Sequence, residues 1–189
     1  MRPYDSVVSD ISTRFRRRAA RFTASVEAVP PERWSLPAPC EGWDARDVVR
    51  HMVDSCGRFL GLIGRSLPPA PSVDDDPVGA WDSARDAVQA CLDDPATATQ
   101  EYEGRVKRMT FEVGVDGFLS WDTVIHTWDL ARAAGLDESL DPADVRDIWA
   151  TILPMDDMLR TAGVCGPKVA VSEDADDQTK LLAFLGRRA

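Results

Sequence analysis

The sequence predicts a mainly all-α protein built around a four-helix bundle, and three observations support this prediction. Apolar residues follow helical spacing through most of the chain. Prolines, glycines and capping aspartates separate the helical segments. A long connection lies between the third and fourth segments, as in bundles that contain a crossover. With 189 residues, 44% of them apolar, the chain is long enough for a sizeable core, and we expect a single domain over residues 1–189.

Helix-breaking and helix-capping residues delimit the first three helices. Pro30 ends the first helix, and Asp44 opens the second with a D-A-R-D pattern that is close to a capping box. A linker rich in proline and aspartate, residues 68–76, follows the second helix, and Pro77 begins the third. These signals place the helices at residues 5–28, 44–66 and 77–92.

The chain changes character between the third and fourth helices. Thr99, Tyr102 and Phe111 favour extended structure, so residues 97–113 predict a short hairpin or an irregular connection. The fourth helix stops at Gly135, a suitable C-cap. A fifth helix begins at Asp141 and Pro142 and should kink or end at Pro154. The expected later helices cover residues 115–134, residue 141 to Pro154, and residues 178–185.

The acidic balance of the chain limits its partners. A net charge of −10 and an isoelectric point near 4.6 argue against a nucleic-acid or an anionic-membrane partner. The arginines of the first helix are the local exception, and we expect them on its solvent-facing side: Arg14, Arg16, Arg17, Arg18 and Arg21. No apolar stretch approaches the roughly 20 residues of a membrane span, and the cysteines form no C-x-x-C pair. We therefore expect a cytoplasmic protein with reduced thiols.

The two histidines of the chain stand in the same sequence frame, D-x3-H-x2-D. The frame is formed first by Asp47, His51 and Asp54, and again by Asp122, His126 and Asp129. Residues three and four apart share one face of a helix, so each frame can present its groups in one direction. Imidazole and carboxylate together are the ligands that zinc, nickel or iron requires.

The second frame faces the protein interior, whereas the first does so only in part. At about 100° per residue, Asp122, His126 and Asp129 fall within one narrow arc that also holds apolar residues. Buried ionisable groups need partners, and a metal is one such partner. In the earlier helix His51 lies at the edge of the buried face, and its flanking aspartates point to the solvated side. The geometry therefore favours His51, Asp122 and His126 as metal ligands.

Three protein ligands would leave one coordination position open. Structural zinc sites are normally closed by four protein ligands, whereas a catalytic or substrate-binding metal needs an open position. Asp129, one turn beyond His126, is better interpreted as a carboxylate that orients the imidazole than as a fourth ligand. A simpler alternative stays open for His51, since a lone histidine at a helix edge is usually partly buried with an ordinary hydrogen bond.

Two segments and the tail resemble a known family. Trp34–His51, read W-S-L-P-A-P-C-E-G-W-D-A-R-D-V-V-R-H, resembles the opening signature of the mycothiol-dependent maleylpyruvate isomerase metal-binding domain, within the DinB-like superfamily. Asp122–Gly135, read D-T-V-I-H-T-W-D-L-A-R-A-A-G, resembles the second metal segment of that family. The tail, from G-P-K-V-A-V to Q-T-K-L-L-A-F-L-G-R, resembles the end of a short actinobacterial branch of the same family.

The resemblance implies a fold, a metal centre and a co-substrate. The fold is an up-down-down-up four-helix bundle, and the metal is a divalent ion held by His51, Asp122 and His126, with zinc as the first expectation and nickel as the second. The isomerase carries Glu where this chain has Asp122, and it has a further C-terminal domain. Mycothiol or another small thiol is the implied co-substrate.

Cys40 is a further candidate, as a reactive thiol. It lies just ahead of the second helix, where the helix dipole favours a thiolate. The family signature also carries a cysteine at this place. The alternative is a loop cysteine that packs against Trp34 or Trp43.

Two functions remain open on the sequence. The first is a metal-dependent enzyme, a thiol S-transferase or isomerase that activates a small thiol or water for reaction with a small electrophile. The second is a non-catalytic, metal-stabilised bundle that acts as a binding or stress-response module, with a homodimer formed through an exposed helix face. Trp121 and Trp128 could belong to such an interface or to the core. Thiol-dependent turnover would favour the enzyme, and a dimer without turnover would favour the module.

Overall fold

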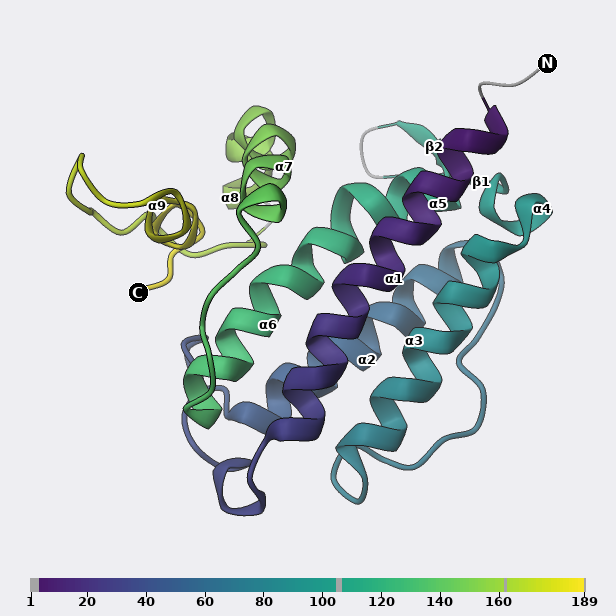
Figure 1. Cartoon of the computed structure of the whole chain (residues 1–189). Helices are drawn as coiled ribbons and strands as arrows, with labels where there is room; N and C mark the ends of the chain where they lie inside the picture. The colour runs from purple at the N-terminus through teal and green to yellow at the C-terminus, as the bar shows by residue number, and fades with distance from the viewer. Residues whose placement is uncertain (1–3, 105–106, 162, 189) are drawn as a thin grey trace.

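The bundle consists of four long helices arranged as a ring. The computed structural model describes residues 4–104, 107–161 and 163–188, with side chains described from residue 10 onward. The bundle helices are α1 (Tyr4–Ala28), α2 (Ala45–Leu62), α3 (Pro77–Asp93) and α6 (Ser120–Ala134). Both α1 and α2 contact α3 and α6. Figure 1 shows α1 and α6 running in one direction and α2 and α3 in the other. This is the up-down-down-up bundle of the predicted fold class, which is confirmed.

The capping signal of α2 works as the sequence predicts, but the helix ends early. The Asp44 side chain accepts a hydrogen bond from the backbone N–H of Asp47, and the Asp47 carboxylate accepts one from the backbone N–H of Asp44. The helix ends at Leu62 and not near Ser66, because Gly64 adopts a left-handed φ of 72° that turns the chain. The linker then returns along the outside of the bundle to the start of α3 (Figure 1), which makes α2 and α3 parallel.

The predicted hairpin between the third and fourth bundle helices is present. The short helix α4 (Pro95–Ala98) leads to β1 (Glu101–Glu103), which pairs antiparallel with β2 (Arg108–Thr110). The next helix, α5 (Phe111–Gly114), continues into α6 through a π-helical turn, Val115–Leu119. The prediction of a regular α-helix from residue 115 is therefore wrong for its first five residues, whose periodicity differs from 3.6. The Gly117 carbonyl accepts a hydrogen bond from the Trp121 indole N–H at 2.6 Å in this turn.

Helix α6 is buried on two sides. One side packs in the bundle core, and the other packs against α7 (Pro142–Ile152), α8 (Asp156–Thr161) and α9 (Asp177–Phe184). Figure 1 shows these later helices grouped beside α6 on one side of the bundle. The helix α7 ends at Ile152, and Pro154 lies in the 3₁₀ turn that follows, so the predicted kink or end at this proline is confirmed. Trp121 and Trp128 belong to this second core, with exposed fractions of 4% and 1%, so they are core residues and not part of an exposed interface.

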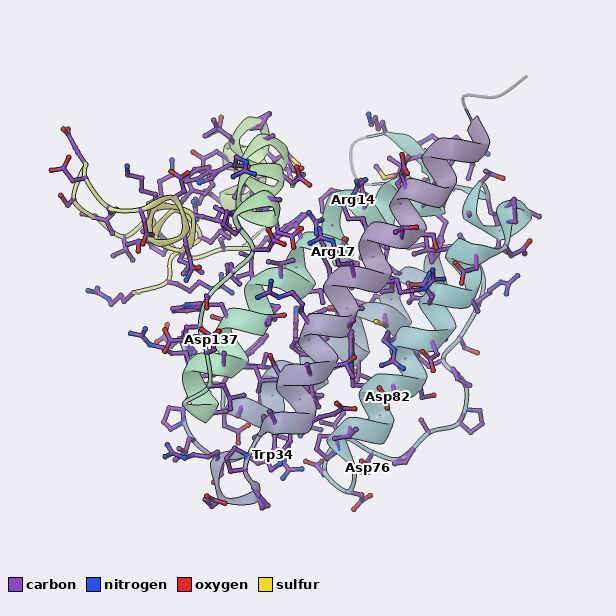
Figure 2. The ribbon with its side chains drawn as sticks, in the orientation of Figure 1. Arg14, Arg17, Trp34, Asp76, Asp82 and Asp137 are labelled. Atoms are coloured by element: carbon purple, nitrogen blue, oxygen red, sulfur yellow. The ribbon has the colours of Figure 1, made fainter. Side chains whose placement is uncertain are left out.

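The arginines of α1 bind carboxylates of other elements. Arg14 pairs with Asp116 of the π-helical turn, and Arg17 and Arg18 pair with Asp144 at the start of α7. Figure 2 shows Arg14 and Arg17 on the side of α1 that faces α6 and α7. Arg18 is only 3% exposed, so the solvent-facing placement expected for this residue is wrong. The periodicity of α1 alone could not reveal that α7 covers this part of its surface.

The sequence predicted no membrane span and reduced cysteines, and the described residues bear on both points. Within residues 4–104, 107–161 and 163–188, no helix combines the length and the apolar character that a membrane span requires. The four cysteines are not joined in disulfides: Cys56 and Cys91 are buried, and Cys40 and Cys165 are half-buried. Burial raises the pKa of the Cys56 thiol to about 12, as for an inert core residue.

Candidate metal centre

Three predicted ligands converge where α2 faces α6. Nε2 of His51 lies 3.1 Å from Oδ2 of Asp122, and Nε2 of His126 lies 3.4 Å from Oδ1 of the same carboxylate. The two imidazole centroids are 4.6 Å apart. One ligand atom from each residue lies within 4.8 Å of the others, although the residues come from two helices and are up to 75 positions apart in sequence. The structure thus brings these side chains together.

The spacing of the donor atoms suits a tetrahedral metal. Zinc–nitrogen bonds of about 2.0–2.1 Å put two ligand atoms of a tetrahedral site roughly 3.3 Å apart. The separations of 3.1 and 3.4 Å lie on either side of that value. Two imidazoles and one carboxylate form a donor set that catalytic zinc sites use, with the fourth position left open. The residues present therefore fit a divalent metal.

The charge distribution of the site also favours a cation. Desolvation raises the pKa of the Asp122 carboxyl, but His126 and His51 outweigh this effect and hold the pKa below its ordinary value. Desolvation lowers the pKa of His126, but Asp122, with a further contribution from Asp129, raises it well above the ordinary value. The carboxylates thus attract positive charge to the centre of the site, and a proton on His126 and a divalent cation would compete for it.

Asp129 lies behind His126, on the side away from Asp122. Its Oδ2 is 2.9 Å from Nδ1 of His126, although the approach lies off the direction of a well-formed N–H hydrogen bond. The Asp129 side chain is fully buried. This is the position expected for a carboxylate that orients a ligating imidazole.

A second set of donors contains Cys40, His126 and Asp129. This set already has a cationic neighbour, because Arg187 donates hydrogen bonds to Asp129 Oδ2 at 2.9 Å and to Cys40 Sγ at 3.6 Å. A fixed guanidinium beside the same donor atoms opposes a metal ion by charge repulsion. The set of His51, Asp122 and His126 is therefore the better candidate for a metal.

Cys40 does not lie at the helix N-terminus as the dipole argument requires. The helix α2 begins at Ala45, and Asp44 caps it. The Cys40 thiol instead donates to Asp129 Oδ2 at 3.6 Å. It is half-buried and lines the cavity described below, so its reactivity stays a prediction.

Three residues near the site were missing from the sequence prediction. The Trp43 ring lies 5.0 Å from the His51 ring and stacks on the His126 ring at 5.8 Å and 20°. Trp43 lies directly before the cap residue of α2, where an apolar residue often packs onto the helix, so its contact with α2 could have been predicted. The Ser55 hydroxyl lies 3.4 Å from His51 Nε2, and its spacing of four residues was likewise readable. Arg187 left no local signal, because its partner Asp129 is 58 residues away.

A cavity of about 1200 Å³ opens beside the three ligands. Its walls come from the loop before α2, α2, the hairpin, the π-helical turn and α6, together with residues from α7 to Pro167 and the C-terminal segment Leu185–Arg187. Its apolar lining includes Phe59, Met109, Phe118 and Met155. Arg58 also lines it and donates to the Ser55 hydroxyl at 2.6 Å, and no carboxylate within the described residues forms an ion pair with this arginine. Single-ligand pockets usually measure about 300–1000 Å³, so the cavity has room for two small molecules.

Comparison with known proteins places the bundle in one family. The family model described as mycothiol maleylpyruvate isomerase N-terminal domain matches residues 15–134. The chain is also 26% identical over 121 residues to two uncharacterized proteins from two strains of Mycobacterium tuberculosis. That match covers 64% of this chain and 65% of each relative, so the chain spans just under two thirds of the length of these relatives. No solved structure matches the chain.

Proposed function

The chain belongs to the mycothiol maleylpyruvate isomerase N-terminal domain family, within the DinB-like superfamily, and from this premise we propose that it is a metal-dependent enzyme acting with a small thiol. In this proposal His51, Asp122 and His126 hold a divalent metal, with zinc as the first choice and nickel as the second. The observation that carries the proposal is the convergence of these donors from two facing helices beside a cavity with room for two small molecules. The donor set leaves one metal position open toward a ligand.

A divalent metal bound there would supply the Lewis acidity that lowers the pKa of a thiol or a water molecule. The protein side chains provide the surroundings for that chemistry. Trp43 covers both imidazoles, and Asp129 supports His126 from behind. Apolar side chains such as Phe59 and Phe118 line the cavity beside these groups.

The cavity suits a reaction between a thiol and an electrophile. Mycothiol or a related thiol would bind with its sulfur toward the three ligands, and a small electrophile would occupy the remaining space. In a transfer reaction a carbon–sulfur bond forms, the thiol proton passes to water, and the leaving group departs with the bonding electron pair. In an isomerisation the thiol adds to a double bond, the new single bond rotates, and elimination releases the thiol. Arg58 is placed to contact an anionic or strongly polar group of either ligand.

Metal content is the measurement that tests this proposal first. Plasma mass spectrometry of tag-free protein should find about one equivalent of zinc or nickel in the wild type, and His126→Ala and His51→Gln should lose it. Asp54→Asn, on the exposed side of α2, is the matched control and should retain the metal. A wild-type protein that takes up no metal even after reconstitution would overturn the proposal.

Turnover then separates an enzyme from a binding module. Thiols should be screened with electrophilic substrates, following the disappearance of each electrophile, with the wild type beside His51→Gln. Consumption that requires both a thiol and the metal ligands supports the enzyme. A protein that holds metal but gives no thiol-dependent turnover would favour the metal-stabilised module, and its oligomeric state by light scattering would then show whether it forms a homodimer.

A further inference from the structure

Arg187 forms a buried ion pair at the rear of the candidate metal centre. Its Nη2 donates to Oδ2 of Asp129 at 2.9 Å, and its Nε donates to Oδ1 of Asp129 at 3.3 Å, so both carboxylate oxygens are engaged. The exposed fractions of the two side chains are 13% and 0%. Desolvation lowers the pKa of Arg187, but Asp129 outweighs it and raises the pKa above its ordinary value. This is the geometry of a forked, charge-assisted pair and not of a surface contact.

The same carboxylate faces a proposed metal ligand. Oδ2 of Asp129, which accepts from Arg187, also lies 2.9 Å from Nδ1 of His126. Nε2 of His126 is on the opposite side of the ring and faces Asp122. Arg187, Asp129 and His126 thus form a chain of contacts. This chain leads through His126 to Asp122, another of the three proposed ligands.

Arg187 comes from a segment outside the matched family domain, which ends at residue 134. It follows α9, and its backbone N–H donates to the carbonyl of Leu182 at 2.8 Å. Its Nη1 donates to the carbonyl of Leu185 at 3.0 Å, which fixes the guanidinium against its own segment. Leu185, Gly186 and Arg187 also line the cavity. The C-terminal segment therefore contacts both the cavity and the rear of the metal centre.

We propose that Arg187 is a positioning residue of the metal centre, which acts on His126 through Asp129. The guanidinium fixes the orientation of Asp129 and balances its buried charge, and Asp129 in turn fixes the ring of His126. The metal centre then extends beyond the bundle into the C-terminal segment. This inference rests on the proposed metal centre for its functional meaning, although the effect of Arg187 on His126 is measurable without metal.

Metal affinity distinguishes a positioning role from a tail anchor. Zinc affinity would be measured by competition with a chromophoric chelator for wild type, Arg187→Ala, Arg187→Lys and the matched control Arg188→Ala, whose side chain is exposed on the neighbouring residue. We expect affinity to fall about 10- to 100-fold in Arg187→Ala, as for the loss of groups that orient metal ligands. Arg187→Lys should recover part of the loss because it retains the charge without the fork. Arg188→Ala should match the wild type.

The alanine variant also removes a buried ion pair, so folding needs its own measurement. Circular dichroism and thermal unfolding of the metal-free proteins would identify variants that remain folded at the assay temperature. If Arg187→Ala does not fold, Arg187→Lys decides the question. A folded variant of Arg187 that melts earlier but binds zinc as tightly as wild type would overturn the proposal and leave Arg187 as a tail anchor.

Nitrogen NMR of the imidazole provides a test that is independent of metal. The chain has two histidines, so in a His51→Gln background the remaining ring signals belong to His126. Without metal and at fixed pH, Arg187→Ala should change the ¹⁵N shifts of His126, and Arg188→Ala should leave them unchanged. Unchanged shifts in folded Arg187→Ala would refute the link to His126. A wild type that binds no zinc but shows the Arg187-dependent shifts would refute the proposed function and retain the positioning relation.

Discussion

Asp122 is the residue that joins the two halves of the candidate metal centre. Its two carboxylate oxygens face different imidazoles, His51 on α2 and His126 on its own helix. Among the three proposed ligands, Asp122 is the one that would bring negative charge to a metal, since histidines are neutral when they bind one. The side chain is 24% exposed, so it borders the cavity and is not enclosed by the core.

Two substitutions at Asp122 separate charge from side-chain length. We expect Asp122→Asn to lower zinc affinity at least about 10-fold, because the amide has no negative charge to neutralise the ion. Asp122→Glu should keep most of the affinity, since the open side toward the cavity can accommodate the extra methylene. Isothermal titration of the metal-free proteins measures both effects. An Asp122→Asn variant that binds zinc as tightly as wild type and Asp54→Asn would contradict the proposed role of the Asp122 charge.

The sequence predicted those features of the candidate site that depend on spacing along one helix. Asp122, His126 and Asp129 lie three and four residues apart, so their shared direction follows from the helix itself. The position of His51 at the edge of a buried face followed from the periodicity of α2. The contact between Arg187 and Asp129 depends on how the tail folds back, and no local pattern encodes such a contact.

The burial of helix α6 extends beyond the face that its periodicity predicts. The apolar arc of α6 correctly indicated a face that contains its ionisable residues. Ser120, Thr123 and Thr127, which lie away from that arc, are nevertheless buried, because neighbouring elements cover this side as well. The π-helical turn Val115–Leu119 also shifts the angular phase of the residues before α6. Such turns are rare in proteins, but those that occur are often found near functional sites. The local composition of this segment did not predict one.

Asp144 links the start of α7 to α1: it is 1% exposed and accepts hydrogen bonds from both Arg17 and Arg18. We expect Asp144→Asn to lower the free energy of unfolding by about 3 kcal/mol at pH 7, because it leaves the buried Arg18 without its closest carboxylate. Urea unfolding measures this change. Asp147→Asn is the matched control, since Asp147 is 58% exposed and lies 3.4 Å from the same arginine. A similar loss in both variants would contradict a specific role for Asp144.

The same ion pair predicts how the difference between wild type and Asp144→Asn depends on pH. Desolvation raises the pKa of Asp144, but the hydrogen bonds from Arg17 and Arg18 outweigh it and lower the pKa below the ordinary value. A carboxyl with a lowered pKa in the folded state stabilises the protein above its unfolded pKa of about 3.9, and this contribution is lost as the pH falls through the folded value. The difference in unfolding free energy should therefore be constant above about pH 5 and shrink below about pH 4. A difference that is independent of pH would show that the carboxylate charge is not its source.

The fold brings together proposed metal ligands from helices that are far apart in the chain. The linker between α2 and α3 makes these two helices parallel, and α2 also contacts α6 in the ring (Figure 1). The element types and the hairpin followed from the sequence, and the family resemblance supplied the helix directions. The second core and the C-terminal wall of the cavity did not follow, because both depend on contacts between segments far apart in sequence.

Because the proposed ligands join α2 to α6, metal binding should stabilise the entire bundle. A ligand that binds only the folded state at 100 times its dissociation constant adds about 2.7 kcal/mol. For a chain of this size each kcal/mol raises Tm by about 2–4 °C, so zinc in that excess should raise Tm by about 5–11 °C. Differential scanning calorimetry of metal-free protein with and without zinc measures the shift. His51→Gln should remove the shift and Asp54→Asn should retain it. An equal shift in His51→Gln would mean that the zinc binds elsewhere, since the bundle would then gain stability without a ligand from α2.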